Sequence, residues 1–196
     1  MRRIHITGGP GSGKTRLAAR LGRQLDLPVY DQDGEALAVL ARLSAEAGVD
    51  YRIDPAPIME QLHAEVTQKM EAFAAQESWV SEGSSVVGAD ALFNCADVVV
   101  MLDCAWQVAA SRIILRHLKA DLARDNRFPG WVRMYRFWRY SIRYYRGRNQ
   151  PGLNDYGVPR NNYFLLDSMR QYEPKLVICR TNRQIEALEA MIAAGE

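Results

Sequence analysis

The sequence predicts an α/β fold in which a five-stranded parallel sheet lies between two layers of helices. Short apolar runs typical of buried strands alternate with longer segments whose apolar residues recur every three or four positions. This alternation favours a parallel sheet, because a crossover between parallel strands leaves room for a helix. With 196 residues, 48% apolar and 24% charged, the chain suits one globular domain, which we expect to span 1–196.

Five segments have the composition of strands. They are 3–7, 28–31, 79–81, 97–103 and 175–179. The fourth is apolar throughout its interior, as expected for a strand that is buried on both faces. It contains the longest clean apolar run of the chain, Val98 to Leu102, which is far shorter than the ~20 residues that a helix needs to cross a bilayer. We therefore expect no membrane segment.

Helices are expected between these strands. The first follows the glycine cluster and ends near Pro28, and two more lie within 34–76. Further helices are expected at about 106–118, near 131–146 and after the fifth strand. The second helix within 34–76 has a start signal in Asp54 and Pro55, an N-cap candidate followed by a proline in the first turn.

Cysteine and histidine are too scattered to predict a metal centre. Cys95, Cys104 and Cys179 are odd in number and have no C-x-x-C spacing. We therefore expect a reduced, cytoplasmic protein without a cysteine metal site. His5, His63 and His117 also lack ligand spacing, and we expect them to have structural or surface roles.

The charge is unevenly distributed although the chain as a whole carries only +2. Between Arg124 and Arg148 there are eight arginines and one acidic residue, Asp125, so this stretch carries +7 and the remainder −5. Such asymmetry predicts a localised anion site. The anion is either a nucleotide phosphate or a nucleic-acid backbone, and composition does not choose between them.

The helix expected near 131–146 has two different faces. Its apolar stripe is Trp131, Tyr135, Trp138, Ile142 and Tyr145. We interpret this stripe as core, because aromatic residues at helical spacing are usually buried. Beside it lie Arg136, Arg139, Arg143 and Arg146. Like charges on one face repel each other, so a compensating anion is expected: a phosphate in a cleft, acidic side chains elsewhere, or nucleic acid.

The residues Gly8-Gly9-Pro10-Gly11-Ser12-Gly13-Lys14-Thr15 match G-x-x-x-x-G-K-[ST] in full. Glycines let backbone N–H groups turn towards a triphosphate, and the following helix directs its N-terminus at the same anion. Lys14 would bind the β- and γ-phosphates, and the Thr15 hydroxyl would bind Mg²⁺. An apolar strand precedes the motif and an amphipathic helix follows it, as this phosphate-binding loop (P-loop) requires. ATP and Mg²⁺ are therefore the expected cofactors.

Further motifs support a resemblance to known kinases. They are 4–15, Tyr30-Asp31-Gln32-Asp33, Trp79-Val80-Ser81-Glu82-Gly83, 96–103, Arg112-Ile113-Ile114-Leu115-Arg116 and the aromatic-basic helix near Trp138. Together they resemble the nucleoside and nucleotide kinase group of P-loop proteins, and in more detail the adenylate-kinase-related bacterial DNA topology modulation protein (FlaR-type) family. The resemblance implies a three-layer P-loop fold with a helical acceptor-binding insert at 34–76 and a basic lid and helix at about 119–150.

Acidic residues at the strand ends are candidates for the metal and the acceptor. Asp31 and Asp33 follow the second strand, at the edge where α/β sheets bind ligands. By resemblance to shikimate-kinase-like proteins, Asp31 would hold Mg²⁺ through water and Asp33 would orient or deprotonate the acceptor; the alternative is an ordinary turn with a helix cap. Glu82 is the candidate for a second metal-side carboxylate or a base. Asp103 resembles a Walker B aspartate, but we expect it to cap the next helix.

Arginines are the remaining candidates for binding the nucleotide and the phosphate groups. By resemblance to kinase lids, Arg112 would stack on the nucleotide base and Arg116 would neutralise the transferring phosphate, whereas Arg124 and Arg127 would close over the site. The alternative for these arginines is a solvated basic helix. Between Gly83 and Asp97 there is no arginine or lysine to bind an acceptor phosphate. Either Arg42 or Arg52 takes that role, or the acceptor carries no phosphate.

The sequence thus favours an ATP- and Mg²⁺-dependent phosphotransferase acting on a small molecule, a nucleoside or nucleotide first of all. A non-nucleotide alcohol is the alternative acceptor. A nucleic-acid-binding or regulatory ATPase is the alternative class, which the arginine helix suggests but which is not favoured, because no nucleic-acid-binding module is recognisable. Whether the protein is a monomer or a homodimer stays open.

Overall fold

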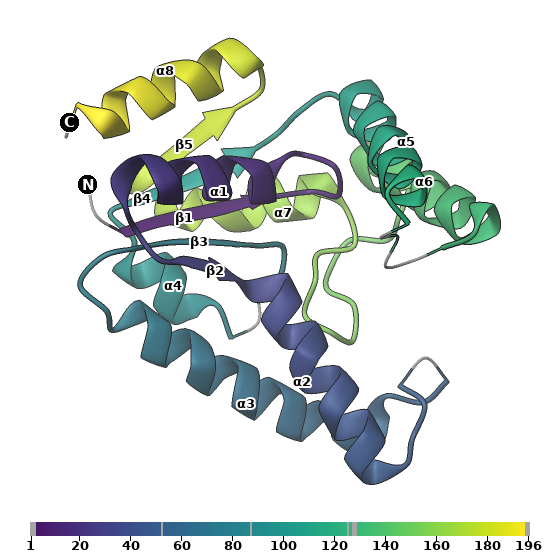
Figure 1. Ribbon diagram of the computed structural model, residues 1–196. Helices are drawn as coiled ribbons and strands as arrows, with labels where there is room; N and C mark the ends of the chain where they lie inside the picture. Colours follow the sequence, from purple (N-terminus) through teal and green to yellow (C-terminus); the bar gives the residue numbers. More distant parts are fainter. Residues whose placement is uncertain (1–2, 52, 87, 125, 127–128, 195–196) are drawn as a thin grey trace.

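The computed structural model describes residues 3–51, 53–86, 88–124, 126 and 129–194 (Figure 1). Five strands form one parallel sheet in the order β2-β3-β1-β4-β5. They are β1 (Arg3–Gly8), β2 (Val29–Asp31), β3 (Trp79–Gly83), β4 (Val98–Leu102) and β5 (Leu176–Cys179). All five lie at the predicted places, which confirms the predicted parallel sheet.

Eight α-helices are present among the described residues. They are α1 (Lys14–Leu25), α2 (Gln32–Ala47), α3 (Ala56–Ala74), α4 (Asp90–Cys95), α5 (Trp106–Leu122), α6 (Trp131–Tyr145), α7 (Asn162–Met169) and α8 (Asn182–Ala193). The sequence did not predict α4, α7 or the 3₁₀ helix Arg170–Lys175. The start of α3 also differs in detail, because Pro55 is its N-cap and Asp54 accepts a hydrogen bond from the Ala56 N–H at 3.1 Å. Among the residues that the structure describes, no helix is long and apolar enough to span a bilayer.

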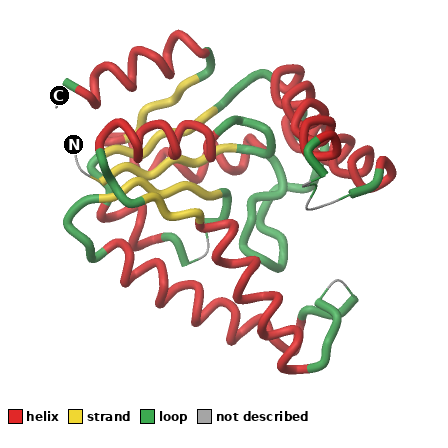
Figure 2. The backbone as a smooth tube through the Cα atoms, in the orientation of Figure 1, coloured by secondary structure: helices red, strands yellow, loops and turns green. Residues whose placement is uncertain are grey.

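Helices cover both faces of the sheet (Figures 1 and 2). On one face, α1 and α8 bury Leu17, Leu21, Leu188 and Ile192 against the strands. On the other face, α3, α4 and α7 pack against the sheet through a larger apolar cluster. Side chains alternate along a strand, so Ile4 and Ile6 of β1 face α1. The fold is therefore the predicted three-layer α/β/α arrangement.

His5 lies between Ile4 and Ile6 and has the structural role that we expected. Its ring is fully buried, forms a 2.8 Å hydrogen bond between Nδ1 and the Ser81 Oγ, and packs edge-on against Phe93. Burial lowers the pKa of His5 from 6.5 to about 3, although the nearby charge of Asp33 opposes the shift.

The order of the strands predicts a ligand-binding crevice at the carboxyl ends of β1 and β3. The loop after β1 leads to α1 on one face of the sheet, whereas the loop after β3 leads to α4 on the opposite face. Two neighbouring strands whose loops part in this way leave a gap at their carboxyl ends, which is where ligands bind in open α/β sheets. The phosphate-loop motif stands at this gap.

Two helix pairs flank the crevice. Helices α2 and α3 of the expected insert pack against each other through Leu40, Leu43, Ile58 and Leu62. Figures 1 and 2 show α2 leading away from the end of β2 and meeting the first turns of α3, whose later turns lie along the sheet. Helices α5 and α6 form the second pair.

The expected burial of the apolar stripe on α6 is wrong for the first half of the helix. Trp131 is 57% exposed and Tyr135 is 50% exposed, whereas Tyr145 is buried. All the buried residues of α6 lie in its last turns, where Tyr144 and Tyr145 pack beneath the phosphate loop. Part of the stripe in the earlier turns therefore remains in contact with solvent.

Candidate active site

The loop 8–15 joins β1 to α1 and has the backbone shape that a phosphate cradle needs. Gly11 and Gly13 have φ angles of +77° and +100°, in the left-handed region that favours glycine. Gly13 is also the N-cap of α1, and no side chain caps the helix there. The first N–H groups of α1 therefore remain available to an anion at the positive end of the helix.

Gly9 is required for a different reason. A Cβ atom at this position would lie 2.7 Å from Cε1 of Tyr144 and 2.8 Å from the hydroxyl of Tyr145. The absence of a side chain thus lets the end of α6 pack directly beneath the loop. The sequence motif identified Gly9 but gave no sign that these two tyrosines support it.

The first two residues of α1 contact one acidic residue at the start of α2 and one on β3. The ammonium group of Lys14 lies 3.3 Å from Oδ2 of Asp33 and 4.0 Å from Oε2 of Glu82. The Thr15 hydroxyl donates a 2.7 Å hydrogen bond to Oε1 of Glu82. Glu82 reaches this position because it lies two residues after Val80 on β3 and therefore faces α1 as well. The structure thus brings together four of the predicted site residues.

Glu82 is the most perturbed carboxyl group of the site. It is 1% exposed. Burial raises its pKa to about 7; Lys14 and the Thr15 hydrogen bond oppose this shift, and the charges of Asp33 and Asp31 add to it. Its Oε2 atom is buried without a hydrogen-bond partner among the described residues. A buried carboxylate oxygen with no donor, beside a threonine hydroxyl, suits a hard divalent cation such as Mg²⁺.

Asp33 links the phosphate loop to the end of β3. Besides its ion pair with Lys14, it accepts hydrogen bonds from the backbone N–H of Ser84 at 3.0 Å and from the Ser84 hydroxyl at 3.3 Å. The same hydroxyl is 3.2 Å from the carbonyl oxygen of Gly8. The side chain of Asp33 nevertheless remains 41% exposed, so it is accessible to a ligand in the crevice. Sequence reasoning missed Ser84, whose only signal was its position directly after Gly83.

Asp31 has a demonstrable structural role. It is the N-cap of α2, and its Oδ1 accepts a 2.8 Å hydrogen bond from the Gly34 N–H. Its side chain therefore stays at the carboxyl end of β2, opposite Glu82 in the strand register. Asp31 therefore caps α2 through one carboxylate oxygen, and its predicted role towards Mg²⁺ through the other oxygen stays a prediction.

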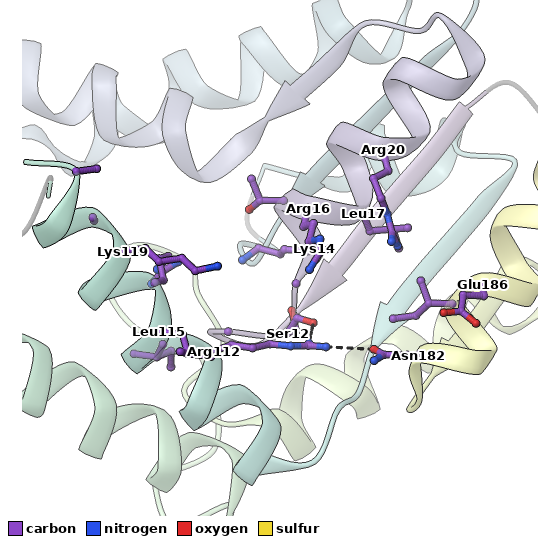
Figure 3. A pocket seen from close by; sticks show the side chains of 18 residues that line it. Ser12, Lys14, Arg16, Leu17, Arg20, Arg112, Leu115, Lys119, Asn182 and Glu186 are labelled. Atoms are coloured by element: carbon purple, nitrogen blue, oxygen red, sulfur yellow. Dashed lines mark hydrogen bonds between the residues drawn. The ribbon is translucent and has the colours of Figure 1, made fainter. Parts of the chain in front are cut away.

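A pocket of about 790 Å³ opens beside the loop, between α1, α5 and α8 (Figure 3). Its lining contains six cationic side chains, those of Lys14, Arg16, Arg20, Arg112, Arg116 and Lys119. Glu186 is the one acidic residue among the lining residues. The pocket is therefore strongly positive, and it includes both arginines that the sequence assigned to the nucleotide.

Arg112 spans the floor of this pocket (Figure 3). Its guanidinium donates to the Ser12 carbonyl at 2.6 Å and to Oδ1 of Asn182 at 3.2 Å, so it ties the phosphate loop to the start of α8. Arg116 lies one turn further along α5, is exposed, and lines the pocket with no ion pair to a described residue. The sequence gave no signal for Asn182.

Asp103 does not cap the next helix, contrary to our expectation. The N-cap of α5 is Ala105, and no side chain forms a capping hydrogen bond there. The carboxylate of Asp103 instead forms a 3.0 Å ion pair with Arg180 and accepts a 2.8 Å hydrogen bond from Asn162. It lines a separate pocket of about 360 Å³ and not the one beside the phosphate loop.

The other candidate arginines lie apart from the phosphate loop or outside the described residues. Arg42 is exposed and pairs with Glu46 at 2.8 Å and with Glu65. Arg124 is exposed, directly after α5. Arg52 and Arg127 lie outside the described residues.

Comparisons with known proteins bear on the fold. No protein-family model and no curated protein sequence matches the chain. The structure is similar to shikimate kinase from Acinetobacter baumannii in complex with shikimate, with a TM-score of 0.50 and 13% identity over 98% of this chain and 90% of that one. Shikimate kinase from Bacteroides thetaiotaomicron gives a TM-score of 0.46 at 15% identity, covering 98% of this chain and 97% of that chain.

These findings define the class of fold. A five-stranded parallel sheet with a glycine-rich loop between β1 and α1 is the P-loop α/β fold, and it is the fold of shikimate kinase. The finer resemblance to the topology modulation family stays a prediction.

Proposed function

We propose that the protein is an ATP- and Mg²⁺-dependent phosphotransferase that moves the γ-phosphate of ATP to a small-molecule acceptor. The observation that carries this proposal is the 3.3 Å contact between Lys14 and Asp33. In this contact the ammonium group that would bind phosphate meets a carboxylate that remains 41% exposed and would be accessible to an acceptor. A donor phosphate held by the first group would lie directly beside an acceptor held by the second.

The residues of the loop and of the basic pocket would bind the nucleotide. The backbone N–H groups of 8–15 and the ammonium group of Lys14 would hold the β- and γ-phosphates. Arg112 and Arg116 would bind the base and the transferring phosphate. Positioning and charge neutralisation supply most of the acceleration in phosphoryl transfer, and the six cations of the pocket suit both tasks.

The residues present fit a magnesium ion. Thr15 and Glu82 would hold it, with Asp31 acting through water from the end of the adjacent strand. In this position Mg²⁺ would supply positive charge that neutralises the phosphates. The free Oε2 of Glu82 and the pKa of about 7 agree with this role, because a buried carboxyl group without a cation is poorly stabilised in its charged form.

Asp33 would act on the acceptor. It is held in place by Ser84, remains 41% exposed, and lies at the carboxyl end of the sheet. From this position it would accept a hydrogen bond from an acceptor hydroxyl and receive its proton during transfer. Under this proposal the helices of 34–76 bind the acceptor, and Lys119, Ala120 and Ala123, the part of the expected basic lid that lines the pocket, cover the nucleotide.

The charges around the insert favour an acceptor without a phosphate group. From Asp31 to Asp97 the sequence has 13 acidic and 3 basic residues. Of these cations, Arg42 pairs with Glu46 and Glu65, and Lys69 pairs with Glu35 at 2.7 Å. A phosphomonoester would meet strong repulsion here. We therefore propose a hydroxyl acceptor, either a nucleoside or a non-nucleotide alcohol, in preference to a nucleotide.

An acceptor screen with γ-labelled ATP tests this proposal. The purified protein and its Asp33→Asn variant are incubated with Mg²⁺, labelled ATP and separate sets of nucleosides, nucleoside monophosphates and polyhydroxy alcohols. We expect label on a nucleoside or an alcohol with the wild type, and a loss of transfer of about 100-fold or more in the variant. Transfer only to monophosphates would reject the proposed acceptor class, and transfer to none of the sets would reject the phosphotransferase.

A further inference from the structure

The exposed face of α6 has an unusual composition. Of the 15 residues of the whole helix, four are arginines and seven are aromatic. The sequence contains no aspartate or glutamate from Asn126 to Asn154. A helix of this kind concentrates positive charge and ring surface on one part of the molecule, and the proposed phosphotransferase reaction gives no use for most of it.

Arg136, Arg139 and Arg143 lie on one side of α6, because they are three and four residues apart. All three are exposed, and none has a carboxylate within 4.0 Å in the described part of the chain. Other arginines of this protein are paired: Arg20 with Glu189, Arg42 with Glu46, and Arg180 with Asp103. The acidic side chains that the structure describes therefore do not relieve the repulsion among the three arginines.

A nucleotide phosphate bound in the pocket beside the phosphate loop would not neutralise these arginines either. Among the described residues that line it, none belongs to α6. Arg112 and Arg116 face the pocket from α5, whereas His117 of α5 packs edge-on against Trp131 of α6 with 5.2 Å between ring centroids. Helix α6 thus packs on a different side of α5 from the side that borders the pocket. No described residue therefore supplies an anion that would compensate these arginines.

Aromatic rings stand beside the arginines. Trp131, Tyr135 and Tyr140 are 57%, 50% and 38% exposed. The guanidinium carbon of Arg139 lies 5.9 Å from the ring centroid of Tyr135. Arginines that neutralise phosphates and aromatic faces on which bases stack are the two components of single-strand binding surfaces. Their combination on one helix favours a strand with unpaired bases over an anion without them.

A lipid surface fits this helix less well. An interfacial helix turns its apolar face outward and keeps its cations at the margins. In α6 the exposed apolar residues Val132 and Phe137 lie five positions apart, on different sides of the helix, so they form no single apolar face, and the exposed arginines lie beside Val132.

We propose that the exposed face of α6 binds single-stranded nucleic acid, with Arg136, Arg139 and Arg143 on its phosphates and Trp131 and Tyr135 against its bases. The three arginines extend over about 10 Å along the helix axis, which corresponds to roughly three nucleotide steps of a stacked strand. This surface is separate from the nucleotide pocket, so the proposal does not depend on the phosphotransferase activity.

Fluorescence anisotropy with a labelled oligothymidylate tests the proposal at about 50 and 200 mM salt. We expect binding that weakens steeply with salt. In the variant Arg136→Gln/Arg139→Gln/Arg143→Gln, affinity should fall at least about tenfold, and the slope of log K against log salt should become shallower by about 2. The control Arg23→Gln/Arg170→Gln/Arg183→Gln removes the same charge from exposed positions outside α6 and should change affinity by less than about twofold.

Two further comparisons identify the ligand. Trp131→Ala/Tyr135→Ala should weaken binding to oligothymidylate and leave binding to inorganic polyphosphate unchanged, because polyphosphate has no bases to stack. Lys14→Ala, which removes the proposed phosphate-binding cation, should keep the oligonucleotide affinity of the wild type. The proposal is overturned by absence of binding at low salt, by equal losses in the two arginine variants, by equal affinity for polyphosphate and oligothymidylate, or by binding to anionic phospholipid vesicles alone.

Discussion

The hydroxyl of Thr15 donates a 2.7 Å hydrogen bond to the buried carboxylate of Glu82. This contact joins the first turn of α1 to the carboxyl end of β3 across 67 positions of sequence. It leaves the second carboxylate oxygen of Glu82 without a hydrogen-bond partner among the described residues, next to Lys14. The two residues thus form a preorganised pair at the point where a metal-bound phosphate would lie.

Replacement of Glu82 tests this pair. Glu82→Gln keeps the size of the side chain but removes its charge, so we expect phosphoryl transfer to fall about 100-fold or more and the dependence of the rate on Mg²⁺ concentration to shift to higher values. Steady-state rates over a magnesium titration measure both effects. Glu82→Asp is the matched control and should recover part of the activity, because it restores the charge. Equal rates in wild type and Glu82→Gln would contradict the role of this carboxylate.

Two replacements of Asp31 separate its cap from its proposed metal role. Asp31→Asn keeps a side-chain oxygen for the Gly34 N–H, so the free energy of unfolding should change little. Asp31→Ala loses the cap and should lower that free energy by about 1 kcal/mol. Urea denaturation measures these changes. Both variants should need more Mg²⁺ for half-maximal activity, and an unchanged magnesium requirement in Asp31→Asn would assign this residue to the cap alone.

Arg112 and Arg116 should affect different steps. Arg112 donates to both Ser12 and Asn182, and a lysine cannot make the two contacts together. We therefore expect Arg112→Lys to weaken ATP binding about tenfold, which corresponds to one lost charge-assisted hydrogen bond. Arg116→Met should lower kcat more than it lowers ATP affinity, because its target is the transferring phosphate. Calorimetry for binding and steady-state kinetics distinguish these outcomes, and the reverse pattern would exchange the two roles.

The buried His5 predicts how stability depends on pH. Its pKa is lowered from 6.5 to about 3 in the folded state, so between these values the unfolded chain binds a proton that the folded protein does not. The contribution of His5 is therefore fully present above pH 6.5 and is lost as pH falls through this window, by at most about 1.4 kcal/mol per pH unit. Urea unfolding of wild type and His5→Gln from pH 7 to pH 4 should show a shallower dependence in the variant. Parallel curves would exclude this contribution.

The nucleotide side of the site was predictable because its signals are local. The spacing from Gly8 to Thr15 fixes a loop, and an apolar strand and a helix adjoin it directly. Glu82 was also predictable, because the residue that ends a strand beside the loop faces the same crevice. The partners of these residues were not: Ser84, Asn182 and Tyr144 come from distant segments and match no local pattern.

The predictions that were wrong rest on local patterns, which do not tell which other element packs against a residue. The stripe that begins at Trp131 has helical spacing, but spacing does not tell whether another element covers that face, and the first turns of α6 stay exposed. Asp103 follows a strand and precedes a helix, as a cap does. The fold nevertheless brings Nε of Arg180 to 3.0 Å from Oδ2 of Asp103, so this carboxylate forms an ion pair and not a helix cap. Helices α4 and α7 are short, with six and eight residues, so their apolar periodicity was too brief to detect.

Calorimetric titration of the protein with a non-hydrolysable ATP analogue and Mg²⁺ tests the central claim most directly, because that claim is a triphosphate held by loop 8–15 and Lys14. We predict one bound nucleotide per chain and, for Lys14→Ala, an affinity lower by at least about tenfold with unchanged far-ultraviolet circular dichroism. No heat of binding in the wild type, or the same affinity in a folded Lys14→Ala variant, would contradict the account.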